Sequence, residues 1–237
     1  MQNGILSGGP AVRAVVLDLD GTLVDSAADI AAALSDVFEA ADLPRVGADA
    51  VESALGFGAF QLVRTVLETV DPRRAADDAA VAALLERYLV RYAADPARHS
   101  TVYADGVAAV TDLHRAGVRL GVCTNKDTAL SEAVLDAVGL AGLIDVVLGR
   151  DAVPHPKPDP RHLLDVLDRL GVAGHEALYV GDNPIDVAVA RGAGTGYRHV
   201  AWGVPVDDAV PRLHRFGDLL ALTTTHARPS TTDDKER

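Results

Sequence analysis

The pattern of hydrophobic and polar positions begins with an uninterrupted apolar run. Residues 14–17, Ala-Val-Val-Leu, lead directly into Asp18 and Asp20. A short run that is apolar throughout is typical of a strand buried on both faces of a parallel sheet. We therefore expect a central strand here, with both acids at its carboxyl end.

From residue 25 to about residue 97, apolar positions recur at helical spacing instead. Two stretches, 25–41 and 77–92, each place their apolar residues on one helical face, and a third amphipathic stretch surrounds residues 62–67. The segment Gly56-Phe57-Gly58 interrupts this pattern, and Asp95-Pro96 ends it. The pattern predicts a small all-helical bundle.

From residue 103 onward, strand-like and helix-like runs alternate. We expect helices over 107–116, 129–138, 160–170 and 185–191, and strands over 119–124, 146–148, 177–180 and 197–200. This alternation indicates an α/β protein with a doubly wound, Rossmann-like parallel sheet. The predicted core comprises residues 12–24 and 98–222, the helical cap 25–97 is inserted into it, and residues 1–11 and 223–237 are expected to be flexible.

Composition narrows the class of protein. The chain has 237 residues, of which 49% are hydrophobic, and a formal net charge of -12. The acidic balance argues against nucleic-acid and membrane-surface partners, because no basic patch would bind phosphate backbones or anionic lipids. The single cysteine, Cys123, excludes an internal disulfide and is expected to be a small buried strand residue. We expect a cytoplasmic protein; monomer and homodimer both remain open.

Candidate chemistry follows the predicted strand ends. Asp18 and Asp20 lie two residues apart, which suits a divalent cation, although an Asp-Gly turn also ends strands without one. Thr124 and Asn125 follow another strand and lead into a helix, where they either hold a phosphate oxygen or only cap the helix. Two acids, Asp182 and Asp186, flank the start of a later helix. Because a helix cap alone needs only one acid, this pair favours a metal ligand together with a second acid that orients it.

Lysine usage is a further signal. The chain has three lysines against nineteen arginines, and Lys126 and Lys157 both fall in candidate site loops. Lys157 lies within His-Pro-Lys-Pro-Asp-Pro, whose prolines fix the direction of its side chain. In a composition so rich in arginine, this lysine indicates a requirement for a compact ammonium.

These loops together give the chain a family resemblance. Residues 12–221 resemble the haloacid dehalogenase superfamily of phosphohydrolases. The match covers four motifs: Asp18-Leu19-Asp20-Gly21-Thr22, Thr124, Lys157, and Gly181-Asp182 with Asp186. The helical insertion is similar to the small cap of that superfamily. The chain departs from the usual pattern at Ala104-Asp105 and at Asn183, and neither departure removes a catalytic group.

The resemblance implies a role for each residue. Asp18 would be the nucleophile that forms an aspartyl-phosphate, and Asp20 the general acid and base. Mg2+ would be held by Asp18, by the main chain of Asp20 and by Asp182. Thr124 and Asn125 would hold phosphate oxygens, Lys157 would offset negative charge, and Asp186 would orient Lys157 or a metal-bound water. In the cap, the loop with Gly56 and Phe57 would meet the leaving group and Arg64 would read a carboxylate, with a plain turn and a solvated helix face as the alternatives.

The substrate expected from this resemblance is a small phosphorylated metabolite. The first motif, Cys-Thr-Asn-Lys and the cap segment Gly-Phe-Gly-Ala-Phe-Gln-Leu-Val look most like 2-phosphoglycolate phosphatases. Such sequences grade into broad sugar-phosphate, nucleotide or pyrophosphate phosphatases, which remain an alternative. A dehalogenase would not need Asp20, and phosphonoacetaldehyde hydrolases and β-phosphoglucomutases depend on a cap lysine, whereas no lysine precedes Lys126.

Two other classes explain part of the pattern. A glycosyltransferase also uses Asp-x-Asp to bind a metal-nucleotide, but it leaves Lys157 and Asp182 unexplained. A receiver-like signalling module combines Asp, Thr and Lys, but it would be about half this length and would lack the helical insertion. A non-catalytic protein that binds a phosphorylated ligand stays a further alternative.

Overall fold

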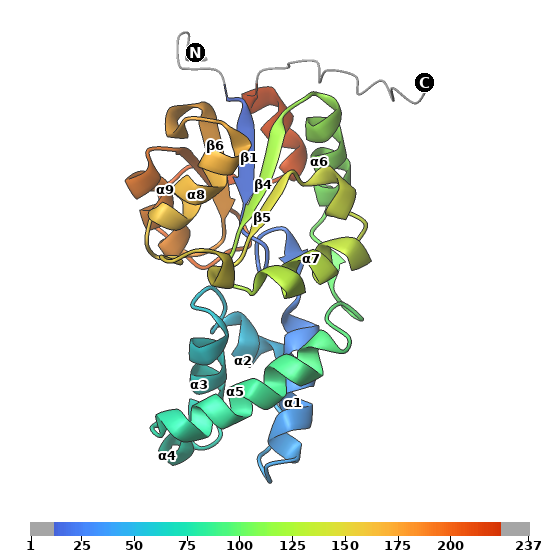
Figure 1. Cartoon of the computed structure of the whole chain (residues 1–237), viewed down its shortest axis with the longest axis vertical. Helices are drawn as coiled ribbons and strands as arrows, with labels where there is room; N and C mark the ends of the chain where they lie inside the picture. The colour runs from blue at the N-terminus through green and yellow to red at the C-terminus, as the bar shows by residue number, and fades with distance from the viewer. Residues whose placement is uncertain (1–11, 224–237) are drawn as a thin grey trace, which may run out of the picture.

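The computed structural model describes residues 12–223 and places a six-stranded sheet above a group of helices (Figure 1). The sheet has the order β5-β4-β1-β6-β7-β8, and all of its pairings are parallel. Its strands are β1 (Ala14–Leu17), β4 (Arg119–Cys123), β5 (Val146–Leu148), β6 (Ala177–Gly181), β7 (Gly196–Val200) and β8 (Arg212–Leu213). The predicted fold class is confirmed.

Helices cover both faces of this sheet. On one side lie α6 (Gly106–Arg115) and α7 (Thr128–Ala137), and on the other α8 (Arg161–Leu170) and α9 (Pro184–Ala193) (Figure 1). The core of this layered unit consists of two hydrophobic clusters, to which β1 contributes alternate side chains. Val15 and Leu17 pack in the first cluster, and Ala14 and Val16 pack in the second. Cys123 is fully buried in the second cluster, as expected of a strand residue.

The cap helices are α1 (Ala27–Glu39), α2 (Ala48–Glu52), α3 (Ala59–Glu68), α4 (Pro72–Ala75) and α5 (Asp78–Ala93). They form a separate hydrophobic cluster in which the predicted apolar faces meet. Two short strands join cap and core: β2 (Val24–Asp25) pairs antiparallel with β3 (Thr101–Val102). The two connections therefore run side by side.

Several elements of the structure were not predicted. These are β2, β3, β8, α2, α4 and the 3-10 segments 141–143, 150–152, 174–176 and 216–222. Of the ends expected to be flexible, Thr223 is described and bridges Val12, whereas residues 1–11 and 224–237 lie outside the described part. Within residues 12–223, no helix combines the length and apolar character needed to cross a bilayer.

Sheet order determines where the candidate loops meet. β1 lies between β4 and β6: the chain continues from β1 to β4 and β5 on one side, and then crosses back to β6, β7 and β8 on the other side. In open α/β sheets, ligands bind beyond the carboxyl ends of the strands at such a switch point. Asp18, Thr124 and Asp182 directly follow β1, β4 and β6. Parallel pairing therefore brings these three residues to one edge of the sheet, facing the cap.

Candidate active site

The centre of the site is an ion pair between Asp18 and Lys157. The Lys157 Nζ atom lies 2.7 Å from Asp18 Oδ2 and 2.9 Å from Asp186 Oδ1. Asp18 Oδ1 accepts a hydrogen bond of 2.7 Å from the backbone N–H of Leu19. All three charged side chains are buried. The structure thus brings together the loops that carry Asp18, Lys157 and Asp186, as expected from the sequence.

Lys157 is held at both its side chain and its backbone. The Lys157 ammonium also donates to the Tyr179 hydroxyl (3.1 Å), which in turn donates to Asp186 Oδ1 (2.8 Å). The Lys157 backbone N–H donates to His162 Nδ1 (3.2 Å). Burial alone would lower the pKa of Lys157, but the charges of Asp18 and Asp186 outweigh it and raise this pKa. Lys157 therefore stays a cation.

Asp182 contributes a third buried carboxylate. Its Oδ1 accepts a hydrogen bond of 2.6 Å from the Thr22 hydroxyl. Carboxylate oxygens of Asp18, Asp182 and Asp186 all lie within 4.8 Å of one another. Burial, together with the nearby charge of Asp18, raises the pKa of Asp182 to about 8. Burial also raises the pKa of Asp18 to about 6, against the opposing charge of Lys157. The cluster thus holds more negative charge than Lys157 offsets, which suits a cation.

Asp186 is committed to protein partners. Its Oδ1 accepts from Lys157 and Tyr179, and its Oδ2 accepts from the backbone N–H of Asn183 (3.1 Å) at the start of α9. Gly181 makes this arrangement possible, since a Cβ atom there would collide with the Asp186 carboxylate. Of the three clustered acids, Asp186 is therefore the one suited to orient Lys157.

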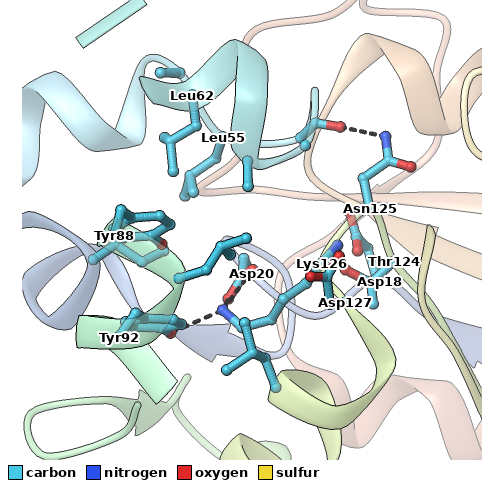
Figure 2. Close-up of a pocket in the computed structure, with 17 residues that line it drawn as sticks. Asp18, Asp20, Leu55, Leu62, Tyr88, Tyr92, Thr124, Asn125, Lys126 and Asp127 are labelled. Carbon is cyan, nitrogen blue, oxygen red and sulfur yellow. Dashed lines mark hydrogen bonds and ion pairs between the residues drawn. The ribbon is translucent and has the colours of Figure 1, made fainter. Parts of the chain in front are cut away.

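The second acid of the first motif, Asp20, points away from this cluster. Its carboxylate accepts from the Lys126 ammonium at 3.0 and 3.1 Å and from the Ser26 hydroxyl at 2.5 Å. Figure 2 shows Lys126 bridging Asp20 and Tyr92 beside Asp18 and Thr124. Sequence reasoning noted Lys126 as a scarce residue but gave it no role, and it did not find Tyr92, Tyr179, His162 or Ser26.

Thr124 and Asn125 have different surroundings. Thr124 is buried beside Asp18 and accepts from the Lys126 backbone N–H (3.2 Å), which leaves its hydroxyl hydrogen available to an incoming oxygen. The Asn125 amide instead donates to the Gly56 carbonyl of the cap (2.8 Å) and to the Lys157 carbonyl (3.0 Å). Both donors of this amide are thus engaged, one with the cap and one within the core, while the buried Asn125 Oδ1 has no hydrogen-bond partner among residues 12–223.

The predicted cap residues are only partly brought to the site. Gly56 and Gly58 line the cavity between cap and core, and the φ of +94° at Gly56 favours glycine. Phe57 does not line that cavity and is 55% exposed. Arg64 does not line it either: its guanidinium pairs with Asp78 and lies over the Phe60 ring, 4.9 Å from the centroid.

Comparison with known proteins places the chain in a family. The family model for haloacid dehalogenase-like hydrolases matches residues 12–194. A phosphoglycolate phosphatase of Rhodospirillum rubrum is 42% identical over 81% of this chain and 80% of its own length. One of Caulobacter vibrioides is 35% identical over 92% and 94%, respectively. A solved structure, a predicted phosphoglycolate phosphatase from Haemophilus somnus, has a TM-score of 0.81 at 25% identity and covers 89% of this chain and 97% of its own.

Proposed function

Because the chain belongs to the haloacid dehalogenase-like hydrolase family, we propose that it hydrolyses 2-phosphoglycolate to glycolate and phosphate. The observation that carries this proposal is the contact of 2.7 Å between Lys157 and Asp18, the latter of which lines the cavity between cap and core. This contact places a carboxylate nucleophile beside a fixed cation, which is the arrangement that phosphoryl transfer requires.

In the first step, an oxygen of Asp18 attacks phosphorus. The new Asp18–phosphorus bond forms as the bond to the ester oxygen breaks, and Asp20 gives its proton to the leaving oxygen. In the second step, Asp20 takes a proton from water, and that water attacks the aspartyl-phosphate and releases phosphate. Lys157 offsets the negative charge between Asp18 and the phosphate, and the Thr124 hydroxyl donates to a phosphate oxygen.

Mg2+ is the proposed cofactor. Asp18, Asp182 and the backbone carbonyl of Asp20 would hold it, with Asp186 supporting the site through Lys157. The fit rests on the buried carboxylate oxygens of Asp18 and Asp182, which lie within 4.8 Å of each other, because such oxygens are the ligands of a hard cation. Burial also raises the pKa of Asp182 to about 8, and a nearby cation would stabilise its ionised form. When bound, the ion would neutralise charge on the transferring phosphoryl group.

A panel of phosphate esters tests the proposal. Wild-type protein should release phosphate from 2-phosphoglycolate with kcat/KM at least about tenfold above that for a hexose phosphate, a nucleotide and pyrophosphate. Chelation of Mg2+ should abolish release, and renewed Mg2+ should restore it. Preference for a hexose phosphate or pyrophosphate would replace the narrow substrate by the broad-specificity alternative. Absence of release from every ester, including an aryl phosphate, would favour a non-catalytic phospho-ligand-binding protein.

A further inference from the structure

Lys126 occupies a position that the proposed catalytic steps do not explain. It lies in the loop after β4, and its side chain is only 6% exposed. Its ammonium contacts both carboxylate oxygens of Asp20 and donates to the Tyr92 hydroxyl at 2.8 Å (Figure 2). Burial of a lysine is costly unless its charge has partners. The buried Lys126 ammonium, which contacts both carboxylate oxygens of the proposed general acid Asp20, therefore needs a functional explanation.

The cavity that Lys126 lines is small, and the cap residues that line it carry no charge. Its volume is about 50 Å3, which corresponds to roughly four water molecules. Of the described residues that line it, Lys126 alone carries a positive charge. Its cap side is formed largely by apolar and tyrosine side chains, which are Ile30, Ala54, Leu55, Ala59, Leu62, Tyr88, Leu89 and Tyr92. Such a space suits a leaving group of a few atoms with one anionic end.

Tyr92 supplies a second donor at the same point. Its hydroxyl oxygen accepts from Lys126, and the described residues offer no acceptor for its hydrogen. Burial, with the nearby charges of Asp20 and Asp29, raises the pKa of Tyr92, so the phenol stays protonated. The Lys126 ammonium and the Tyr92 hydroxyl therefore form a pair of donors that a carboxylate can accept from.

Arg64, the cap cation expected from the sequence to read a carboxylate, is engaged elsewhere. Its guanidinium pairs with Asp78 on α5 and stacks on Phe60. It does not line the cavity. Recognition of an anionic leaving group inside the cavity thus falls to Lys126.

We propose that Lys126 and Tyr92 bind the carboxylate of the substrate, and that this carboxylate replaces Asp20 at the Lys126 ammonium. The inference rests on the function proposed above and adds how that site selects its substrate. An incoming carboxylate exchanges one anion for another, so Lys126 is never left buried without a partner. Asp20, once released from the ammonium, takes up a proton from solvent and turns toward the leaving oxygen, to which it then gives that proton. An ester without a carboxylate leaves Asp20 paired with Lys126 and reacts slowly.

The test compares two esters of nearly equal size in wild-type protein and in Lys126→Met. One ester is 2-phosphoglycolate, and the other is 2-hydroxyethyl phosphate, in which a hydroxymethyl group replaces the carboxylate. The ratio of their kcat/KM values should fall by about 10- to 100-fold in the variant, because a charge-assisted contact to the carboxylate is lost. Most of this fall should appear as a higher KM for 2-phosphoglycolate.

Two further variants make the test specific. Tyr92→Phe keeps the packing and the charge, and it should lower the same ratio by about 3- to 10-fold through loss of one donor. It replaces Lys126→Met if that variant does not fold. Arg91→Met is the matched control, since it removes a cation that pairs with Asp36 on the outside of the cap. The ratio in Arg91→Met should equal that of wild type.

The outcomes separate this inference from the proposed function. A wild-type enzyme that prefers 2-phosphoglycolate, together with variants that keep the preference, would overturn the role of Lys126 and leave the function standing. An equal loss on both esters would also overturn it, because Lys126 would then act only by positioning Asp20. A wild-type enzyme with no preference for the carboxylate would remove both the substrate and the inference.

Discussion

At the scale of single residues, Lys157 shows how a buried charge is held in place. Asp18 and Asp186 balance it, Tyr179 contacts its ammonium, and His162 fixes its backbone. Sequence patterns predicted the three charged residues because acids and a lysine at strand ends are unusual. Tyr179 and His162 were not predicted as site residues, because a tyrosine in an apolar strand and a histidine in an amphipathic helix are as typical of core packing as of a functional site.

His162 gives a prediction about acid stability. Burial, together with the charge of Lys157, lowers its pKa from 6.5 to about 4. The unfolded chain therefore takes up a proton near pH 6.5 that the folded protein refuses until about pH 4. Between these values His162 makes the unfolded state bind more protons, so the contribution of His162 to the free energy of unfolding should decrease as pH falls, by about 3 kcal/mol. Asp18 and Asp182, whose pKa values are raised, contribute with the opposite sign, so the effect of His162 is measured against a variant.

His162→Gln is the variant that isolates this effect. Glutamine can still accept from the Lys157 backbone N–H and donate to the Leu148 carbonyl, the two contacts of the imidazole. Urea unfolding at several pH values should therefore show the free energy of unfolding of the wild type falling by about 3 kcal/mol relative to that of the variant between pH 6.5 and 4. Parallel curves for both proteins would show that His162 does not titrate in this way.

At the scale of elements, long periodic segments were predictable and short ones were not. The helices α1, α3 and α5 carry apolar faces over several turns, which the sequence reveals. In contrast, β2, β3 and β8 are two residues long and carry no period. Their existence depends on partners far along the chain. The conformation of Asp105 likewise depends on residues far along the chain: with a left-handed backbone, its carboxylate accepts hydrogen bonds from the N–H groups of Phe216 and Gly217.

The connection between cap and core depends on one buried acid. Asp29, in the first turn of α1, accepts from the backbone N–H of His99, from the backbone N–H of Ser100 and from the Ser100 hydroxyl. These bonds measure 2.9, 2.7 and 2.6 Å. They join the first cap helix to the segment through which the chain returns to the core.

Asp29→Ala should therefore destabilise the protein by about 2–4 kcal/mol, because it removes the buried carboxylate that accepts these three charge-assisted hydrogen bonds. Asp36→Ala is the matched control on the same helix, since Asp36 forms only half-exposed ion pairs worth about 1 kcal/mol or less. Urea unfolding with an unchanged m-value measures both. Equal effects of the two substitutions would mean that the Asp29 contacts do not secure the connection.

At the scale of the whole molecule, sheet order explains why an acidic chain can bind an anion. The chain carries a net charge of -12, yet two of its three lysines lie in the connections that follow β4 and β5, where Lys126 pairs with Asp20 and Lys157 pairs with Asp18. The convergence of the site loops could be predicted, because parallel strands place their carboxyl ends at one edge. The docking of the cap could not, since the contacts of Asn125 with Gly56 and of Lys126 with Tyr92 join segments with no shared pattern.

The central claim is that Asp18 accepts the phosphoryl group. Its most direct test is a rapid acid quench of the Mg2+-loaded wild-type protein during turnover of 2-phosphoglycolate, followed by mass spectrometry of its peptides. We predict phosphate on the peptide that contains Asp18, and at least about a 10³-fold loss of phosphate release in a folded Asp18→Asn variant. Turnover without a phosphorylated Asp18 peptide, or a variant that retains activity, would contradict the account.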